Sequence, residues 1–261
     1  MNLDDAYAIA AHTPGWEAFP PRWTKASQDF REALGARAEI GVGYGPSVRQ
    51  VYDLFHPSGP SAGTVVFVHG GYWKAFDRTF WSYLAAGPLA RDRAVAMVGY
   101  DLCPAVKISE ITGQVARAIA AIAGRTTGPI ALTGHSAGGH LVARMLAPGV
   151  LPEAVRDRVT RTVPIAPLAD LEPLLQTSMN DDLGLDLKEA QAESPVRQPK
   201  PKGVAVTVWV GADERPALLD QARWLADAWQ ANLVTIPGKH HFDVIDALAD
   251  PGSAMVSALL D

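Results

Sequence analysis

The chain has 261 residues, of which 48% are hydrophobic, and its 23 basic and 28 acidic residues leave a formal net charge of −5. A chain of this length and apolar content can bury one large core. The charged residues form no basic stripe, which argues against a nucleic acid partner. No run of 18 apolar residues predicts a membrane span, and the acidic start, Met1–Asp5, is unlike a signal peptide, so we expect a cytoplasmic protein with no membrane partner.

The first recognisable segment, from Trp16 to Trp23, is rich in aromatic residues. It either packs along the rim of a pocket or covers an edge of a sheet, and the pattern leaves both readings open. Two segments with partial alternation of apolar and polar residues come next. They predict a pair of antiparallel edge strands, Ala38–Tyr44 and Gln50–Phe55.

A short run typical of a buried strand, Thr64–Val68, leads directly into the sequence His-Gly-Gly-Tyr-Trp at residues 69–73. Glycine lets the backbone approach closely and turn its amides inward. Such amides can stabilise the oxyanion that forms when a nucleophile attacks a carbonyl group. We assign this role to the N–H groups of Gly71 and Tyr72, with Gly70 shaping the loop of this oxyanion hole.

The most informative motif is G-x-S-x-G at residues 134–138. It follows a predicted strand, Pro129–Thr133, and precedes a predicted helix, His140–Leu146. A serine on a sharp turn between a strand and a helix is held in a strained conformation, with its hydroxyl raised above the sheet edge. Ser136 is therefore the candidate nucleophile, and the N–H of Ala137 is the third candidate donor of the oxyanion hole.

Strands and helices alternate along the rest of the chain. This order predicts a mainly parallel sheet of eight strands with helices on both faces. The single cysteine, Cys103, excludes an internal disulfide, and packing explains it better than catalysis because no acid–base partner is close in sequence. The further predicted strands are Ala94–Gly99, Arg161–Ile165, Val204–Val210 and Asn232–Ile236, and the predicted helices are Ile111–Ala123 and Ala217–Gln230.

Residues 166–203 are too many for a tight connection, and they contain five prolines and two short helical patterns, Leu171–Leu175 and Leu187–Ala192. We interpret this segment as a small lid over the active site within a single domain that spans residues 1–261. The alternative is a long surface excursion.

A nucleophilic serine commonly acts with a base and an acid. In hydrolases that carry the serine on a G-x-S-x-G turn after a strand, these follow it along the chain in the order acid, then histidine. Two carboxylates, Asp213 and Glu214, come directly after the strand Val204–Val210. Two histidines, His240 and His241, come after the last predicted strand. The residues by themselves leave both choices open.

Four motifs together resemble the arylformamidase (kynurenine formamidase) family of α/β-hydrolases. The resemblance covers the chain from about Val51 onward and implies the α/β-hydrolase fold. It also implies hydrolysis of N-formylkynurenine to kynurenine and formate in tryptophan breakdown. The motifs are HGGYW at residues 69–73, YDLCP at 100–104, GHSAGGH at 134–140 and HFD at 241–243.

The resemblance also ranks the candidate acid and base. Related hydrolases place their acid three residues after the glycine that ends the strand, here Gly211, which favours Glu214 over Asp213. Eukaryotic relatives commonly carry aspartate there, but glutamate serves as the triad acid in other hydrolases. A histidine immediately before an apolar residue matches the related enzymes, which favours His241 over His240.

The resemblance therefore implies a triad of Ser136, His241 and Glu214, with an oxyanion hole formed by Gly70, Gly71, Tyr72 and Ala137. Neither a metal nor a cofactor is required by this chemistry. The expected partner is a small-molecule substrate, and a homodimer is possible. The side chains next to the oxyanion loop, Tyr72 and Trp73, are expected to bind substrate.

Two other classes of function remain as alternatives. The first is a carboxylesterase that acts on short-chain acyl esters, because bacterial proteins of this kind include such enzymes. The second is a non-catalytic binding protein with a hydrolase fold. The second is less favoured, since such proteins usually lose a triad residue and this chain has a candidate for each.

Overall fold

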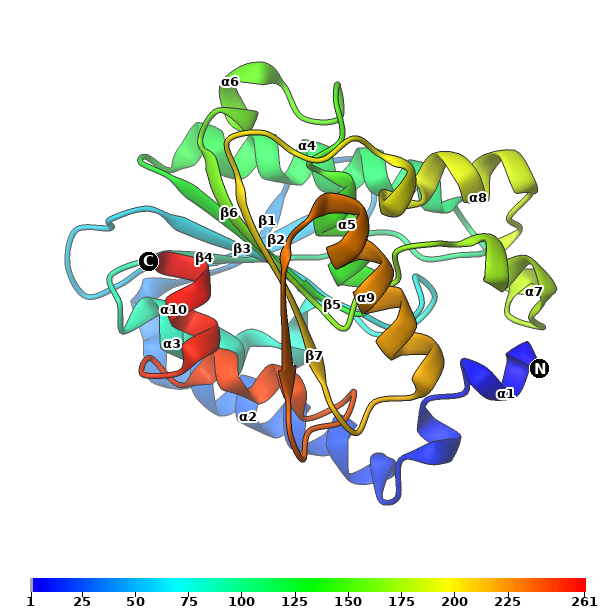
Figure 1. Ribbon diagram of the computed structural model, residues 1–261. Helices are drawn as coiled ribbons and strands as arrows, with labels where there is room; N and C mark the ends of the chain where they lie inside the picture. Colours follow the sequence, from blue (N-terminus) through cyan, green and yellow to red (C-terminus); the bar gives the residue numbers. More distant parts are fainter. Residues whose placement is uncertain (1) are drawn as a thin grey trace.

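A computed structural model describes residues 2–261, and one eight-stranded sheet runs through its centre (Figure 1). Strand β1 pairs antiparallel with β2, β2 pairs antiparallel with β4, and every other pair in the sheet is parallel. The spatial order is β1-β2-β4-β3-β5-β6-β7-β8. The strands are β1 (Ala38–Gly43), β2 (Val51–Phe55), β3 (Thr64–Val68), β4 (Ala94–Val98), β5 (Ile130–His135), β6 (Val159–Ile165), β7 (Ala205–Gly211) and β8 (Asn232–Ile236).

This sheet confirms the predicted fold class, the mainly parallel eight-stranded sheet of an α/β-hydrolase. Of the two strands predicted at an edge, β1 is an edge strand, whereas β2 lies between β1 and β4 and pairs antiparallel with both. The predicted strands all form, and their ends differ from the prediction by no more than a few residues. The helix after the serine motif begins earlier than predicted, at Ala137, because the turn at Ser136 passes directly into helical backbone.

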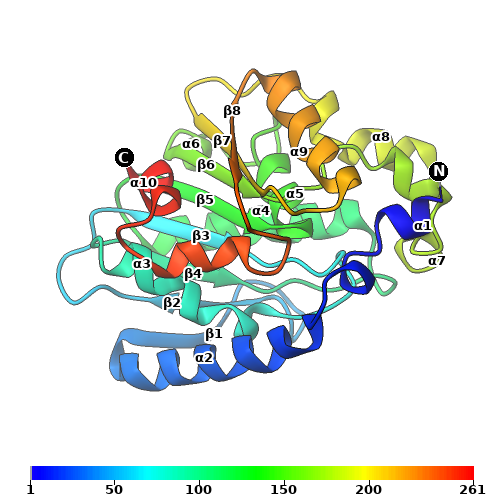
Figure 2. The same ribbon diagram turned by 60° about the horizontal axis from the view of Figure 1, so that its bottom comes forward.

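Helices cover both faces of the sheet (Figures 1 and 2). Side chains along a strand alternate between faces, so Val66 and Val68 of β3 pack into one core while Val65 and Phe67 pack into the other. The first core includes apolar residues of α4 (Ile108–Arg125), α5 (Ala137–Arg144) and α9 (Pro216–Trp229). The second includes residues of α2 (Phe19–Leu34), α3 (Ala86–Leu89) and α10 (Ala254–Leu260).

The remaining helices are short. Among residues 2–261, no helix combines the length and the apolar character that a bilayer span requires. The short α-helices are α1 (Leu3–Ala6), α6 (Glu153–Arg156), α7 (Asn180–Leu183) and α8 (Leu187–Glu193). The 3₁₀ turns are Ala10–His12, Trp16–Ala18, Gly35–Arg37, Arg78–Phe80, Ser82–Ala85, Glu172–Gln176, Pro195–Arg197 and Val244–Ala249.

The parallel strands β3, β5, β7 and β8 end at the same edge of the sheet. The loops that follow these strands carry the oxyanion-loop candidates, Ser136, the acid candidates and the histidine candidates. Residues far apart in the sequence are gathered here because parallel strands present all their carboxyl ends together.

Candidate active site

Ser136 lies between β5 and α5 with a backbone φ of 56° and ψ of −118°. This conformation is costly for a residue other than glycine and persists only where its surroundings enforce it. The Ser136 N–H donates to the carbonyl of Ile165 at 2.8 Å. A side chain at Gly134 or Gly138 would collide with neighbouring backbone, so the turn requires small residues at both positions. The residue is buried but lines a pocket.

The loop after β3 lies against this turn. A Cβ atom on Gly70 would fall 2.8 Å from the carbonyl oxygen of His135 and 3.0 Å from Cβ of Ser136, so only glycine allows this approach. The next residues have positive φ, 110° at Gly71 and 47° at Tyr72. Within residues 2–261, the amides of Gly71 and Tyr72 donate to no protein acceptor. Backbone N–H groups in such a position can bind a developing negative charge.

Ala137 is the first residue of α5. The first N–H groups of a helix have no partner within the helix, and the helix dipole favours negative charge beside them. Gly70 lies against the serine turn, Gly71 and Tyr72 line the same pocket as Ser136, and Ala137 directly follows Ser136. Their role in catalysis stays a prediction.

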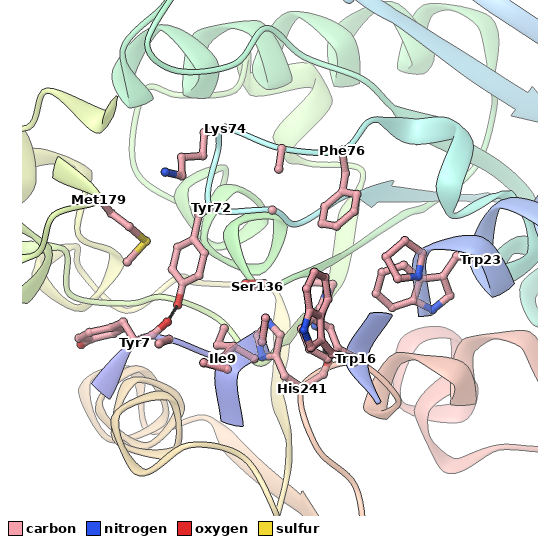
Figure 3. Close-up of a pocket in the computed structure, with 18 of the residues that line it drawn as sticks. Tyr7, Ile9, Trp16, Trp23, Tyr72, Lys74, Phe76, Ser136, Met179 and His241 are labelled. Atoms are coloured by element: carbon pink, nitrogen blue, oxygen red, sulfur yellow. Dashed lines mark hydrogen bonds between the residues drawn. The ribbon is translucent and has the colours of Figure 1, made fainter. Parts of the chain in front are cut away.

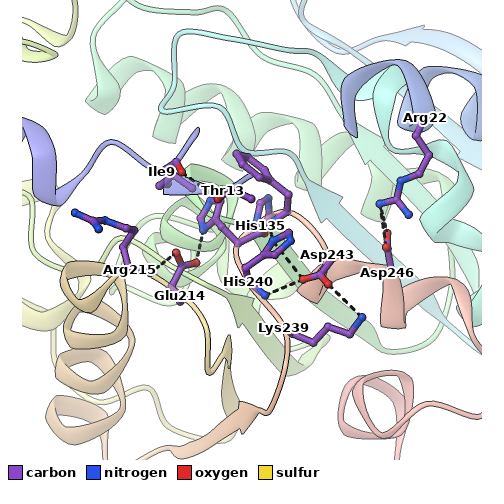
Figure 4. A network of polar contacts seen from close by, with 12 residues as sticks. Ile9, Thr13, Arg22, His135, Glu214, Arg215, Lys239, His240, Asp243 and Asp246 are labelled. Atoms are coloured by element: carbon purple, nitrogen blue, oxygen red, sulfur yellow. Dashed lines mark hydrogen bonds and ion pairs between the residues drawn. The ribbon is translucent and has the colours of Figure 1, made fainter. Parts of the chain in front are cut away.

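His241 and Glu214 form a buried pair on the loops after β8 and β7. The Nδ1 atom of His241 lies 2.5 Å from Oε2 of Glu214, and the exposed fractions of the two side chains are 4% and 0%. The other carboxylate oxygen, Oε1, accepts the backbone N–H of Arg215 at 2.9 Å. Figure 4 shows Glu214 within this network. Because the carboxylate accepts at Nδ1, the Nε2 atom of His241 is left available for acid–base chemistry.

The competing candidates lie elsewhere. Asp213 is exposed, and its backbone N–H donates to the carbonyl of Lys239 at 2.9 Å. The ring of His240 lies 3.4 Å from a carboxylate oxygen of Asp243 and packs edge-on against Phe19, with 5.4 Å between centroids. The structure thus joins Glu214 to His241 and leaves the neighbour of each outside the pair.

A cavity of about 430 Å³ brings Ser136 and His241 together (Figure 3). The hydrogen bonds of residues 2–261 do not include one between the Ser136 hydroxyl and His241, and such bonds often form only with substrate bound. Most of the lining is apolar. The lining residues are Tyr7, Ala8, Ile9, Ala10, Ala11, Trp16, Pro20, Trp23, Gly71, Tyr72, Lys74, Ala75, Phe76, Trp81, His135, Ser136, Met179, His241 and Phe242.

Lys74 is the formally charged residue among these lining groups. Its Nζ atom is 2.6 Å from a carboxylate oxygen of Asp182, so its charge is already paired. The aromatic segment near the N-terminus contributes Trp16 and Trp23, which matches the first of its two predicted placements.

The prediction that Tyr72 and Trp73 both bind substrate needs a correction. Tyr72 lines the cavity, but the indole of Trp73 is fully buried in the core and packs edge-on against His140, with 5.0 Å between ring centroids. The side chains of Tyr72 and Trp73 therefore point in different directions, and of these two only Tyr72 faces the cavity.

Sequence reasoning missed other lining residues. His135 is the variable position before the serine in the G-x-S-x-G motif, which gives no sign of a role, yet it lines the cavity beside His241. Tyr7 and Ile9 were not singled out, because a short apolar pattern near the N-terminus gives no sign of what it packs against. Met179, in the long segment after β6, was missed for the same reason.

Comparison with known proteins identifies relatives over the full chain, although no family model matches. The kynurenine formamidase of Danio rerio is 26% identical over 274 aligned residues, which cover 100% of this chain and 90% of the relative. The kynurenine formamidase of Drosophila melanogaster is 29% identical over 225 residues, covering 77% of this chain and 74% of the relative.

Among solved structures, a "putative thioesterase" from Silicibacter sp. TM1040 is 54% identical, with a TM-score of 0.98 over 100% of both chains. Esterase B of Lactobacillus rhamnosis is 22% identical, with a TM-score of 0.67 over 92% of this chain and 89% of the other, which shows a shared fold. The similarity to three kynurenine formamidases supports an arylformamidase-like family of α/β-hydrolases for this chain. It is a hydrolase. Two of its features can carry a mechanism: the serine turn and the buried histidine–carboxylate pair.

Proposed function

We propose that this hydrolase cleaves formamides of aromatic amines, with N-formylkynurenine as the substrate, through a triad of Ser136, His241 and Glu214. The observation that carries the proposal is the 2.5 Å contact between His241 and Glu214 beside a cavity that Ser136 also lines. The similarity to kynurenine formamidases supports the choice of substrate.

The reaction is a two-step acyl transfer. His241 takes the proton of the Ser136 hydroxyl while the oxygen attacks the formyl carbon. Glu214 holds the imidazole in the required tautomer and stabilises its protonated form. The oxyanion is stabilised by the amides of Gly71, Tyr72 and Ala137, each of which is typically worth about a hundred- to a thousandfold in rate.

Collapse of the first intermediate breaks the carbon–nitrogen bond, and His241 protonates the departing aniline nitrogen. A water molecule, deprotonated by the same histidine, then attacks the formyl ester on Ser136. The second collapse releases formate and returns the proton to the serine oxygen. An aryl amide suits this sequence because its nitrogen is a better leaving group than that of an alkyl amide.

Residues 166–203 fit the role of a small lid. Met179 of this segment lines the cavity, and Asp182 of the same segment pairs with Lys74, which also lines it. We therefore propose that the segment is part of the same domain and closes one side of the substrate site.

A second candidate function, a carboxylesterase for short-chain acyl esters, is favoured by the apolar lining. The cavity offers few polar groups beyond the reacting ones, and the charge of Lys74 is already paired. An uncharged ester could bind there without leaving buried charges unmatched.

The test is a comparison of kcat/KM for N-formylkynurenine with kcat/KM for p-nitrophenyl acetate and butyrate, with Ser136→Ala as the control for background hydrolysis. The proposal expects N-formylkynurenine to exceed both esters. Ester turnover above that of the formamide would transfer the assignment to the carboxylesterase. No turnover of any of the three by the folded protein would refute both.

A further inference from the structure

Residues 3–18, which we call the N-terminal strap, form one wall of the cavity. The strap contains α1 and the 3₁₀ turns Ala10–His12 and Trp16–Ala18. It lies more than a hundred residues before Ser136 in sequence, yet it supplies about a third of the lining. The strap residues that line the cavity are Tyr7, Ala8, Ile9, Ala10, Ala11 and Trp16.

The outer part of the strap is held by polar contacts near the surface. A carboxylate oxygen of Asp4 accepts the N–H of Ser178 at 2.6 Å and its hydroxyl at 2.9 Å, which fastens α1 beside α7 (Figures 1 and 2). Asp5 pairs with Arg215 at 3.0 Å and with His12 at 2.7 Å. Exposed ion pairs of this kind contribute little to stability because solvent screens their charges.

The inner part is held at Tyr7. The Tyr72 hydroxyl donates to the carbonyl of Tyr7 at 2.9 Å, and Figure 3 shows this bond at the edge of the cavity. The side-chain amide of Gln221 donates to the Tyr7 hydroxyl at the same distance. Burial raises the pKa of Tyr72 well above its ordinary value, so its hydroxyl stays protonated and remains a donor. The strap is thus attached to the oxyanion loop itself.

Ile9 is the large aliphatic side chain of this wall. Its neighbours Ala8, Ala10 and Ala11 also line the cavity but are small, whereas Ile9 is only 6% exposed and reaches the same cavity as Ser136 and His241. The other large groups of the lining, such as Trp23 and Trp81, are packed into the second core. Ile9 also belongs to the first core, so a change of its size alters the cavity together with the edge of that core, and the folding of each variant has to be verified.

We propose that the N-terminal strap is the specificity-determining wall of the active site, and that Ile9 sets the size of the uncharged apolar group that the substrate can carry. This inference rests on the proposed function, because it assumes that Ser136 reacts in this cavity. The strap contributes no charged side chain to the lining, so the group that contacts it is an alkyl or aryl group without charge.

The test compares wild type, Ile9→Ala and Ile9→Trp, with Ile40→Ala as the matched control. Ile40 is an exposed isoleucine of β1 that does not line the cavity. Two substrate series are measured, because Ile9 can face either part of the substrate. One series lengthens the acyl chain of p-nitrophenyl esters from acetate to octanoate, and the other lengthens the alcohol of alkyl acetates from ethyl to octyl.

Each methylene group that gains a buried site changes kcat/KM by about fourfold. In at least one series, Ile9→Ala should raise the ratio of long-chain to short-chain kcat/KM by that factor or more, and Ile9→Trp should lower it. Ile40→Ala should leave both ratios as in wild type. Unchanged ratios in both Ile9 variants, with folding verified by circular dichroism, would overturn the inference.

If neither Ile9 variant folds, Trp16→Ala on the same wall replaces them. Like Ile9→Ala, it should raise the ratio of long-chain to short-chain kcat/KM. A failure of the proposed function has a different signature. In that case the wild type itself shows no turnover that depends on Ser136, whereas failure of the inference leaves an active wild type and active variants with unchanged selectivity.

Discussion

The Nε2 atom of His135 lies 2.9 Å from the backbone carbonyl oxygen of His241, and the centroids of the two imidazole rings are 4.5 Å apart. A carbonyl can only accept, so Nε2 of His135 carries the proton. Burial holds the pKa of His135 well below its usual range, so the ring is neutral. This bond ties the residue before the candidate nucleophile to the loop that carries the candidate base.

His135→Phe keeps a ring in place but removes the donor to His241. We expect kcat to fall by about a hundredfold with little change in KM, because a small displacement of a catalytic group is costly. Steady-state kinetics checks this expectation, with His56→Phe as a control at a half-exposed histidine that pairs with Glu39. Loss of stability without loss of kcat would mean that His135 only packs the core.

Ser136→Ala should lower kcat by about four to six orders of magnitude while the fold stays intact. The reason is that the alanine side chain has no nucleophile, and only the oxyanion hole and binding remain. A fluorophosphonate should label Ser136 in the wild type, as read by peptide mass spectrometry. Labelling of a different serine, or an active alanine variant, contradicts the proposed mechanism.

Glu214→Gln should reduce kcat by about a thousandfold or more, since an amide favours the wrong imidazole tautomer at His241. Asp213→Asn is the matched control, because Asp213 is exposed and lies next to Glu214 in sequence. It should retain nearly all activity. The opposite ranking of the two variants would assign the acid to Asp213.

His241→Ala should abolish turnover, whereas His240→Ala should keep most of it. The reason is that Glu214 is bonded to His241, while the ring of His240 lies near Asp243. The measurement is kcat/KM for both variants, with circular dichroism as the control for folding. Near-normal activity of a folded His241→Ala variant would exclude it as the base.

The free energy of unfolding should decrease as the pH is lowered from about 6.5 to about 4. Burial lowers the pKa of His69 and of His140 to about 4, whereas an unfolded histidine titrates near 6.5. Between these values the unfolded chain binds protons that the native state does not, so acid favours unfolding. Each histidine contributes a slope of about 1.4 kcal/mol per pH unit at most.

Urea unfolding at several pH values measures this slope, and His140→Gln is the informative variant. Glutamine can still donate to the Glu193 carbonyl that His140 contacts at 2.7 Å, but it does not titrate. In this variant, the slope of the free energy of unfolding against pH should therefore fall by about the contribution of one histidine. The pKa of the Glu193 carboxyl is also lowered, but this carboxyl changes the free energy of unfolding only below about pH 4.5, its ordinary pKa. Most of the range from about pH 6.5 to about pH 4 therefore reports on histidines. An unchanged slope in His140→Gln contradicts the assignment.

The sequence by itself determined the fold class and the candidate nucleophile. Both depend on local features: alternation of strands and helices, and a turn whose small residues at Gly134 and Gly138 are required by contacts close to the turn. The same is true of Gly70 and Gly71, because a backbone that bends so sharply after β3 tolerates few other residues.

The residues by themselves left open which side chain of each adjacent pair enters the site. The family resemblance favoured Glu214 and His241, the tertiary structure joins these two, and only the tertiary structure separated Tyr72 from Trp73. Asp213 and Glu214, His240 and His241, and Tyr72 and Trp73 each differ by one position, and a loop without regular backbone has no period from which to predict direction. The strap wall at Ile9 was equally hidden, because its contacts join segments more than a hundred residues apart. Such contacts are set by how the strands are ordered in the sheet and not by any pattern within the strap.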